Sequence, residues 1–124
     1  MKLIRWAVTL AYAGVIFYLS SRTWPNAPSF PYADKIAHII LYTGFGGLVL
    51  WSLRKTRFRG NSYIYAVAII LSTSYGLSDE VHQLFIPGRE FSIFDLMADA
   101  VGSAIGVLVV TKLATLASKE KVLI

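Results

Sequence analysis

Cysteine is absent from the 124-residue chain. This absence excludes thiolate nucleophiles, cysteine-based zinc sites, iron–sulfur clusters and disulfide bonds. A metal ion would therefore need histidine and carboxylate ligands, and the chain contains only two histidines. Charged residues are also scarce, since they make up 15% of the chain whereas hydrophobic residues make up 56%. A soluble domain typically carries about 25% charged residues, so this composition indicates a membrane protein with room for one domain.

Four stretches of the chain have the length and apolar character of transmembrane helices. A helix that crosses a hydrocarbon core of roughly 30 Å needs about 20 mostly apolar residues. Asp95 and Asp99 make the last stretch the least certain of the four by hydropathy. The predicted fold is an all-α membrane bundle of four helices that forms a single domain over residues 1–124. The expected spans are residues 3–20, 36–53, 62–78 and 93–111.

The basic residues indicate how this bundle is oriented. Four spans place both termini on one side of the membrane, and nine Lys and Arg lie on that side against three on the other. By the positive-inside rule, both termini and the loop at 54–59 are expected in the cytoplasm. The +5 net charge is thus a topology signal and gives no indication of nucleic-acid binding. The nine are Lys2, Arg5, Arg54, Lys55, Arg57, Arg59, Lys112, Lys119 and Lys121, and the three are Arg22, Lys35 and Arg89.

An alternative for the first run is a cleaved signal peptide, because Lys2 and Arg5 precede an apolar stretch. No clear small-residue cleavage site follows, and three further spans need an anchor of matching topology. We therefore expect the first run to remain as a membrane span in a multi-pass protein of the plasma membrane.

Acidic residues and both histidines gather at the side that carries few basic residues. Within each predicted helix these polar residues recur three or four positions apart, so they share one face. Ionised side chains deep in a bilayer cost about 2.5–3.5 kcal/mol, and such residues normally face the bundle interior or a wet cavity. The sets are Asp34, His38 and Tyr42 in the second helix, Asp79, His82 and Gln83 in the third, and Asp95 and Asp99 in the fourth.

The connection between the third and fourth spans adds two polar groups to this cluster. Ser92 is placed to cap the fourth helix, and Arg89 offers a planar fork for carboxylate or phosphate. Asp95 and Asp99 lie one helical turn apart, so they repel each other when both are ionised. At least one of them must be protonated, paired with Arg89 or Lys35, or bound to a metal.

Two separated segments of the cluster carry a family resemblance. DKIAHIILY (Asp34–Tyr42) and SDEVHQLFIPGREFSIFDLMADAVGSAIG (Ser78–Gly106) resemble the VanZ family, named for a protein associated with low-level teicoplanin resistance. Where the family commonly has Asn near the start of its last helix, this chain has Asp99. The resemblance implies a multi-pass plasma-membrane protein linked to the cell envelope and to glycopeptide antibiotic sensitivity. It implies no settled biochemical activity.

Three interpretations of the polar cluster remain open. The first is a site that binds or processes a lipid-linked or peptidoglycan-related ligand, with a histidine as acid or base and Arg89 with Lys35 as anion clamp. The second is a non-catalytic network that holds the helix ends together. The third is a divalent metal site at His38, His82 and one or more of Asp79, Glu80, Asp95 and Asp99, with Asp79 favoured by its spacing to His82. The candidate catalytic residues are Asp34, Lys35, His38, Asp79, Glu80, His82, Arg89 and Asp95, and the candidate binding residues are Tyr42, Gln83, Ser92 and Asp99.

Small residues in the last span predict close helix packing. Gly102 and Gly106 form a small-xxx-small pair, and Gly44, Gly46 and Gly47 in the second span follow the same principle. Packing within one chain and dimerisation are both consistent with this pattern.

Overall fold

The computed structural model describes residues 2–23, 32–54 and 62–123. Within these residues the chain forms four α-helices and no strand, which confirms the predicted all-α class. Lys55, Arg57 and Arg59 of the basic loop lie outside the described residues. The helices are α1 (Lys2–Ser20), α2 (Ala33–Leu53), α3 (Ile64–Gln83) and α4 (Ile93–Leu123).

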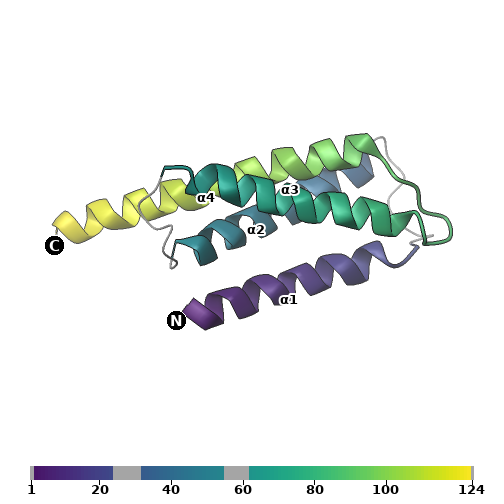
Figure 1. The fold of residues 1–124 in the computed structure, drawn as a ribbon. Helices are drawn as coiled ribbons and strands as arrows, with labels where there is room; N and C mark the ends of the chain where they lie inside the picture. Colours follow the sequence, from purple (N-terminus) through teal and green to yellow (C-terminus); the bar gives the residue numbers. More distant parts are fainter. Residues whose placement is uncertain (1, 24–31, 55–61, 124) are drawn as a thin grey trace.

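Successive helices run in opposite directions (Figure 1). The ends of α1 and α3 and the beginnings of α2 and α4 therefore lie at the same end of the bundle, which we call the polar end. The N-terminus of α1, the end of α2 and the beginning of α3 lie at the opposite end. This arrangement brings together the three polar sets that lie far apart in the sequence.

The closest helix pair is α2 with α4, and glycines make that approach possible. A Cβ atom at Gly46 would lie 2.6 Å from the backbone of Ser103, and one at Gly102 would lie 2.5 Å from the Ile39 carbonyl oxygen. A Cβ atom at Gly106 would overlap the Thr43 carbonyl oxygen. Small residues let helix backbones meet in this way in membrane bundles. The packing that the glycine pattern favours is made between two helices of one chain.

Three helices, α1, α2 and α4, are long and apolar enough to cross a membrane. The expectation that the last span would be the least certain is wrong, because the apolar sequence of α4 continues far beyond Asp99. The third expected span, residues 62–78, corresponds to α3, which is not among the three helices apolar enough to cross a membrane. Its helix carries Ser72, Thr73 and Ser74 in the middle and Asp79 near the end, and these residues lower its apolar character.

The outer surface of the bundle is apolar. Large aliphatic and aromatic side chains such as Leu10, Phe17, Ile40, Ile70 and Leu108 are exposed. A continuous apolar surface of this kind is unfavourable in water but suits the hydrocarbon region of a bilayer. The interior is packed by a smaller apolar core whose buried members include Tyr42, Phe45, Val49, Leu50, Ile64, Ala68 and Val107.

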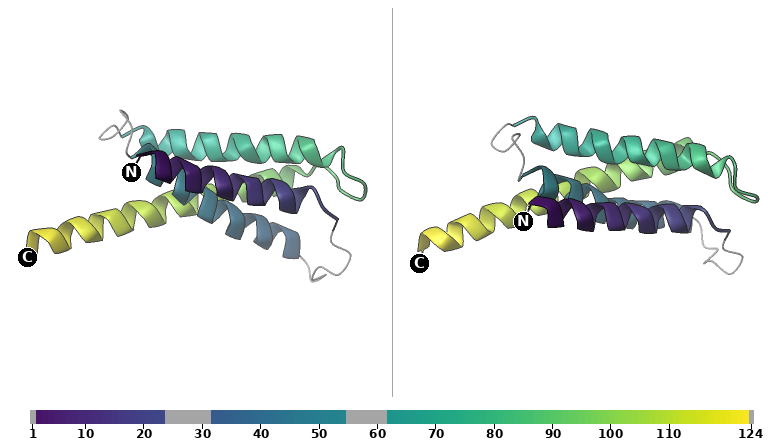
Figure 2. Two further views of the ribbon diagram at one scale, coloured as in Figure 1. Left: turned by 90° about the horizontal axis from the view of Figure 1, so that it is seen from below. Right: turned by 60° about the horizontal axis from the view of Figure 1, so that its bottom comes forward.

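Helix α4 is longer than a membrane is thick. Its 31 residues extend for about 46 Å at 1.5 Å per residue, whereas the hydrocarbon core is roughly 30 Å across. The last turns extend beyond the other helices (Figure 2). The C-terminal part of α4 carries Lys112, Lys119 and Lys121 and lies at the end of the bundle that holds the N-terminus.

Candidate ligand pocket at the polar end

A cavity of about 700 Å³ lies at the polar end of the bundle. It is bounded by the end of α1, the beginning of α2, the end of α3 and the connection to α4. Ser20, Thr23 and Glu90 line it in addition to the candidate residues predicted from sequence. Its predicted lining residues are Asp34, Lys35, His38, Tyr42, Asp79, Gln83, Arg89, Ser92 and Asp95.

Lys35 joins two carboxylates at the mouth of this cavity. Its Nζ lies 2.6 Å from Asp34 Oδ2 and 2.8 Å from Asp95 Oδ1. Asp34 is largely exposed, whereas the Asp95 side chain is only 10% exposed. The expected pairing of one α4 carboxylate with a cation is therefore the ion pair between Asp95 and Lys35. The positive charge of Lys35 is neutralised by carboxylates of the protein itself.

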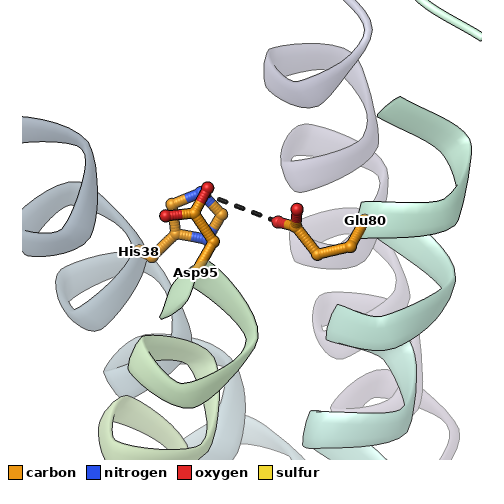
Figure 3. Close-up of side chains that lie close together, drawn as sticks. All are labelled: His38, Glu80 and Asp95. Carbon is orange, nitrogen blue, oxygen red and sulfur yellow. Dashed lines mark ion pairs between the residues drawn. The ribbon is translucent and has the colours of Figure 1, made fainter. Parts of the chain in front are cut away.

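His38 lies between carboxylates on both sides of its ring. Nδ1 is 2.7 Å from Oδ1 of Asp99, which is fully buried. With Asp99 ionised, its carboxylate can only accept, so Nδ1 would carry the proton in this contact. Nε2 faces Oδ2 of Asp95 at 3.6 Å and Oε1 of Glu80 at 4.0 Å. Figure 3 shows the His38, Glu80 and Asp95 side chains, from α2, α3 and α4, pointing toward one another.

Glu80 is fully buried, and only one of its two carboxylate oxygens accepts a hydrogen bond within the described residues. Its Oε2 accepts the Ser92 backbone N–H at 3.1 Å. Within the described part of the chain, its Oε1 has no hydrogen-bond partner. Glu80 lies past the expected end of the third span, and burial raises the pKa of its carboxyl to about 7. The Ser92 hydroxyl accepts the Asp95 N–H at 3.3 Å, which confirms the predicted cap of α4.

Arg89 extends from the connection between α3 and α4 to the cavity wall. Its Nη1 donates to the Arg22 carbonyl oxygen at 2.9 Å. The Gln83 amide, oriented with its oxygen toward Arg89, accepts from Nη2 at 2.5 Å and donates to Glu80 Oε2 at 3.3 Å. No ion pair joins Arg89 to a carboxylate among the described residues. Arg89 is therefore held by neutral acceptors in this part of the chain.

His82 and Asp79 make their contacts with α1. His82 Nε2 lies 2.9 Å from the Ser21 hydroxyl, and its ring stacks on Phe17 with centroids 4.6 Å apart. The Ser20 hydroxyl donates to Asp79 Oδ1. These contacts tie the end of α3 to the end of α1.

The histidines are consequently divided between two places. Among the described residues, His38, Glu80 and Asp95 form the group that offers three ligand atoms within 4.8 Å of one another. His82 and Asp79, the other two members of the predicted metal set, do not belong to this group. The reason is that successive helical residues point about 100° apart, so Asp79 faces α1 while Glu80 faces α2 and α4. The spacing of Asp79 and His82 predicts that they share one face of α3. It does not predict which helix packs against that face.

A family comparison agrees with the motifs at this end of the bundle. The model of the VanZ/LLP1 family matches residues 4–115, which include the three polar sets. No match was found among curated proteins. No solved structure matches either. With three helices capable of crossing a bilayer and a family match over most of its length, the chain belongs to the VanZ/LLP1 family of membrane proteins.

Proposed function

We propose that this chain is a multi-pass plasma-membrane protein whose polar pocket opens on the extracytoplasmic side and binds a cell-envelope component. The component is lipid-linked or peptidoglycan-related. The orientation follows from the excess of Lys and Arg at the end that holds both termini. The pocket lies at the opposite end.

The observation that carries this proposal is a charged cavity at the end of lipid-facing helices. The cavity volume of about 700 Å³ is in the range of small-molecule sites. A lipid-linked ligand can keep its chain beside the apolar outer surface while its head group enters from the membrane boundary. Arg89 reaches this cavity without a carboxylate partner among the described residues, so it is suited to a phosphate or a peptide carboxylate.

His38 is the residue best placed to move a proton in this pocket. It lines the cavity, and the hydrogen bond to Asp99 fixes the orientation of its ring. A general acid or base needs this combination of access and fixed geometry. Acid–base turnover of the bound ligand would use His38 Nε2 when no ion occupies that nitrogen, whereas simple binding would depend mainly on Arg89.

A second candidate function is structural, and it is favoured by the contacts that the polar residues make with one another. Lys35 neutralises Asp34 and Asp95, and Asp79 is bonded to Ser20 of α1. Such a network can hold helix ends in register without any ligand. In this case removal of Arg89 should affect stability and nothing else.

Ligand binding by the purified protein separates the two functions. Native mass spectrometry in detergent should detect a complex with a polyprenyl pyrophosphate or with its disaccharide-peptide derivative. Arg89→Gln should weaken binding at least tenfold in a protein that stays folded, with only a small loss of melting temperature from the hydrogen bonds to Arg22 and Gln83. Arg54→Gln at the opposite end should leave binding unchanged. Absence of binding by the wild type, or equal binding by Arg89→Gln, would favour the structural function.

A further inference from the structure

We propose that His38, Glu80 and Asp95 bind a divalent transition-metal ion, Mn²⁺ or Zn²⁺, in the wall of the polar pocket. This site is independent of the proposed envelope ligand, because it rests only on the side chains that face one another at the polar end. Each residue comes from a different helix, so the ion would join α2, α3 and α4.

The distances among the three side chains are close to those between atoms that bind the same metal ion. Nε2 of His38 lies 3.6 Å from Asp95 Oδ2 and 4.0 Å from Glu80 Oε1. Both distances are too long for hydrogen bonds. Two ligand atoms that each bind an ion at about 2.1 Å in tetrahedral geometry lie roughly 3.4 Å apart. A small movement of Glu80 toward His38 therefore completes the arrangement.

Asp99 supplies the outer support that metal-binding histidines usually have. Its Oδ1 accepts the Nδ1–H of His38 at 2.7 Å. With the proton on Nδ1, the lone pair of Nε2 points at the two other carboxylates. A carboxylate behind the imidazole fixes its tautomer and raises its basicity as a metal ligand.

Glu80 gives a second, independent indication of a cation. Its side chain is 0% exposed, and Oε1 has no hydrogen-bond partner within the described residues while it faces His38 Nε2. When Glu80 is ionised, this buried carboxylate oxygen without a partner costs several kcal/mol, and with the His38 proton on Nδ1 the lone pair on Nε2 adds to that cost. An ion between these atoms removes both costs.

The donor set and the position indicate the class of ion. One imidazole nitrogen with two carboxylates suits first-row divalent metals better than Mg²⁺ or Ca²⁺, which prefer all-oxygen ligands. His38 and Asp95 also line the cavity. The remaining coordination positions would therefore face the pocket, as in metal sites that keep a position open for water or a ligand.

Metal binding by the full chain tests this inference without any envelope ligand. The protein is purified in detergent, stripped with chelator and titrated with ZnCl₂ or MnCl₂ by calorimetry. One ion per chain is expected, with affinity reduced at least tenfold in Glu80→Gln and in Asp95→Asn. His82→Ala and the exposed-carboxylate control Glu90→Gln should bind like wild type.

A second measurement on the wild type covers the case in which the variants fail to fold. Pulsed electron paramagnetic resonance of bound Mn²⁺ should show coupling to one imidazole nitrogen. The inference is overturned by the absence of saturable binding of either metal, by full binding in Glu80→Gln, or by bound Mn²⁺ without nitrogen coupling. Failure of the envelope ligand to bind would leave these results unchanged, so the two proposals fail separately.

Discussion

The His38 imidazole joins Asp99 to the pocket: Nδ1 lies 2.7 Å from the buried Asp99 carboxylate, and Nε2 faces Asp95 at 3.6 Å. The resemblance to the VanZ family singles out position 99 because an amide is common there and this chain has a carboxylate. An ionised carboxylate holds a histidine ring more firmly than an amide does, since charge-assisted hydrogen bonds are about twice as strong. Asp99 is therefore a positioning residue that acts through His38.

Asp99→Asn should weaken binding of Zn²⁺ or Mn²⁺ by about 10- to 100-fold, the usual effect of losing an outer partner of a metal-binding histidine. The three proposed ligands stay in place in this variant. Calorimetric titration and a melting curve on the same sample give the comparison. An unchanged metal affinity would contradict the positioning role of Asp99. A loss of affinity that is fully explained by a lower melting temperature would contradict it as well.

Gly106→Ala should destabilise the protein by about 1–3 kcal/mol, the usual cost of overpacking. The added Cβ overlaps the Thr43 carbonyl oxygen of α2, and that backbone atom has no freedom to move away. Gly14→Ala is the matched control, because a Cβ atom there meets nothing within 4 Å. The control should retain or gain stability, by up to about 1 kcal/mol from the better helix propensity of Ala. Chemical unfolding in detergent gives both values, and equal effects would contradict the packing described for α2 and α4.

Thr9 and Ser52 should show a measurable coupling between α1 and α2. Their hydroxyl oxygens lie 2.7 Å apart, and both side chains are buried. Hydrogen bonds between membrane helices average about 0.6 kcal/mol in double-mutant cycles. We expect a coupling of that order from Thr9→Val, Ser52→Ala and the double variant. A coupling of zero would mean that α1 is held to α2 by other contacts, such as the Arg5 guanidinium stacked on Trp51.

Expression of this chain in a teicoplanin-susceptible bacterium should raise the concentration of teicoplanin needed to stop growth. This expectation follows from the proposed envelope ligand, because a protein that binds or alters such a component changes the target to which the antibiotic binds. Arg89→Gln should lose the effect and Arg54→Gln should keep it, at equal amounts of membrane protein. An unchanged sensitivity with the wild type would separate this chain from the resistance that gave the family its name.

The sequence predicts the helices and the polar end well, because apolar length and charge distribution are local properties. The observed starts of α1 and α4 lie within a residue of the expected spans, and Ser92 caps α4 as its position suggests. Helix α3 shows the weakness of ranking spans by the charges near their start, since Asp79 and Glu80 near its end and the hydroxyl residues around Ser72 lower its apolar character, whereas α4 stays apolar far beyond Asp99.

The grouping of the polar side chains is less predictable, because it depends on the rotation of each helix about its own axis. Asp79 and Glu80 are adjacent in sequence, yet one contacts Ser20 of α1 and the other faces His38 of α2. Spacing within α3 gives the angle between them but not which neighbour each will meet. That choice is made by packing along the whole helix, where Ala68 and Gly76 are buried against other helices.

Labelling of single cysteines shows whether the polar pocket faces the outside of the cell. The chain has no cysteine of its own, so Glu90→Cys at the pocket and Ser118→Cys near the end of α4 each create a unique thiol. In intact spheroplasts a membrane-impermeant maleimide should label Glu90→Cys and should reach Ser118→Cys only after lysis. Labelling of Ser118→Cys in intact spheroplasts, with Glu90→Cys protected until lysis, would place the pocket in the cytoplasm and contradict the proposed envelope function.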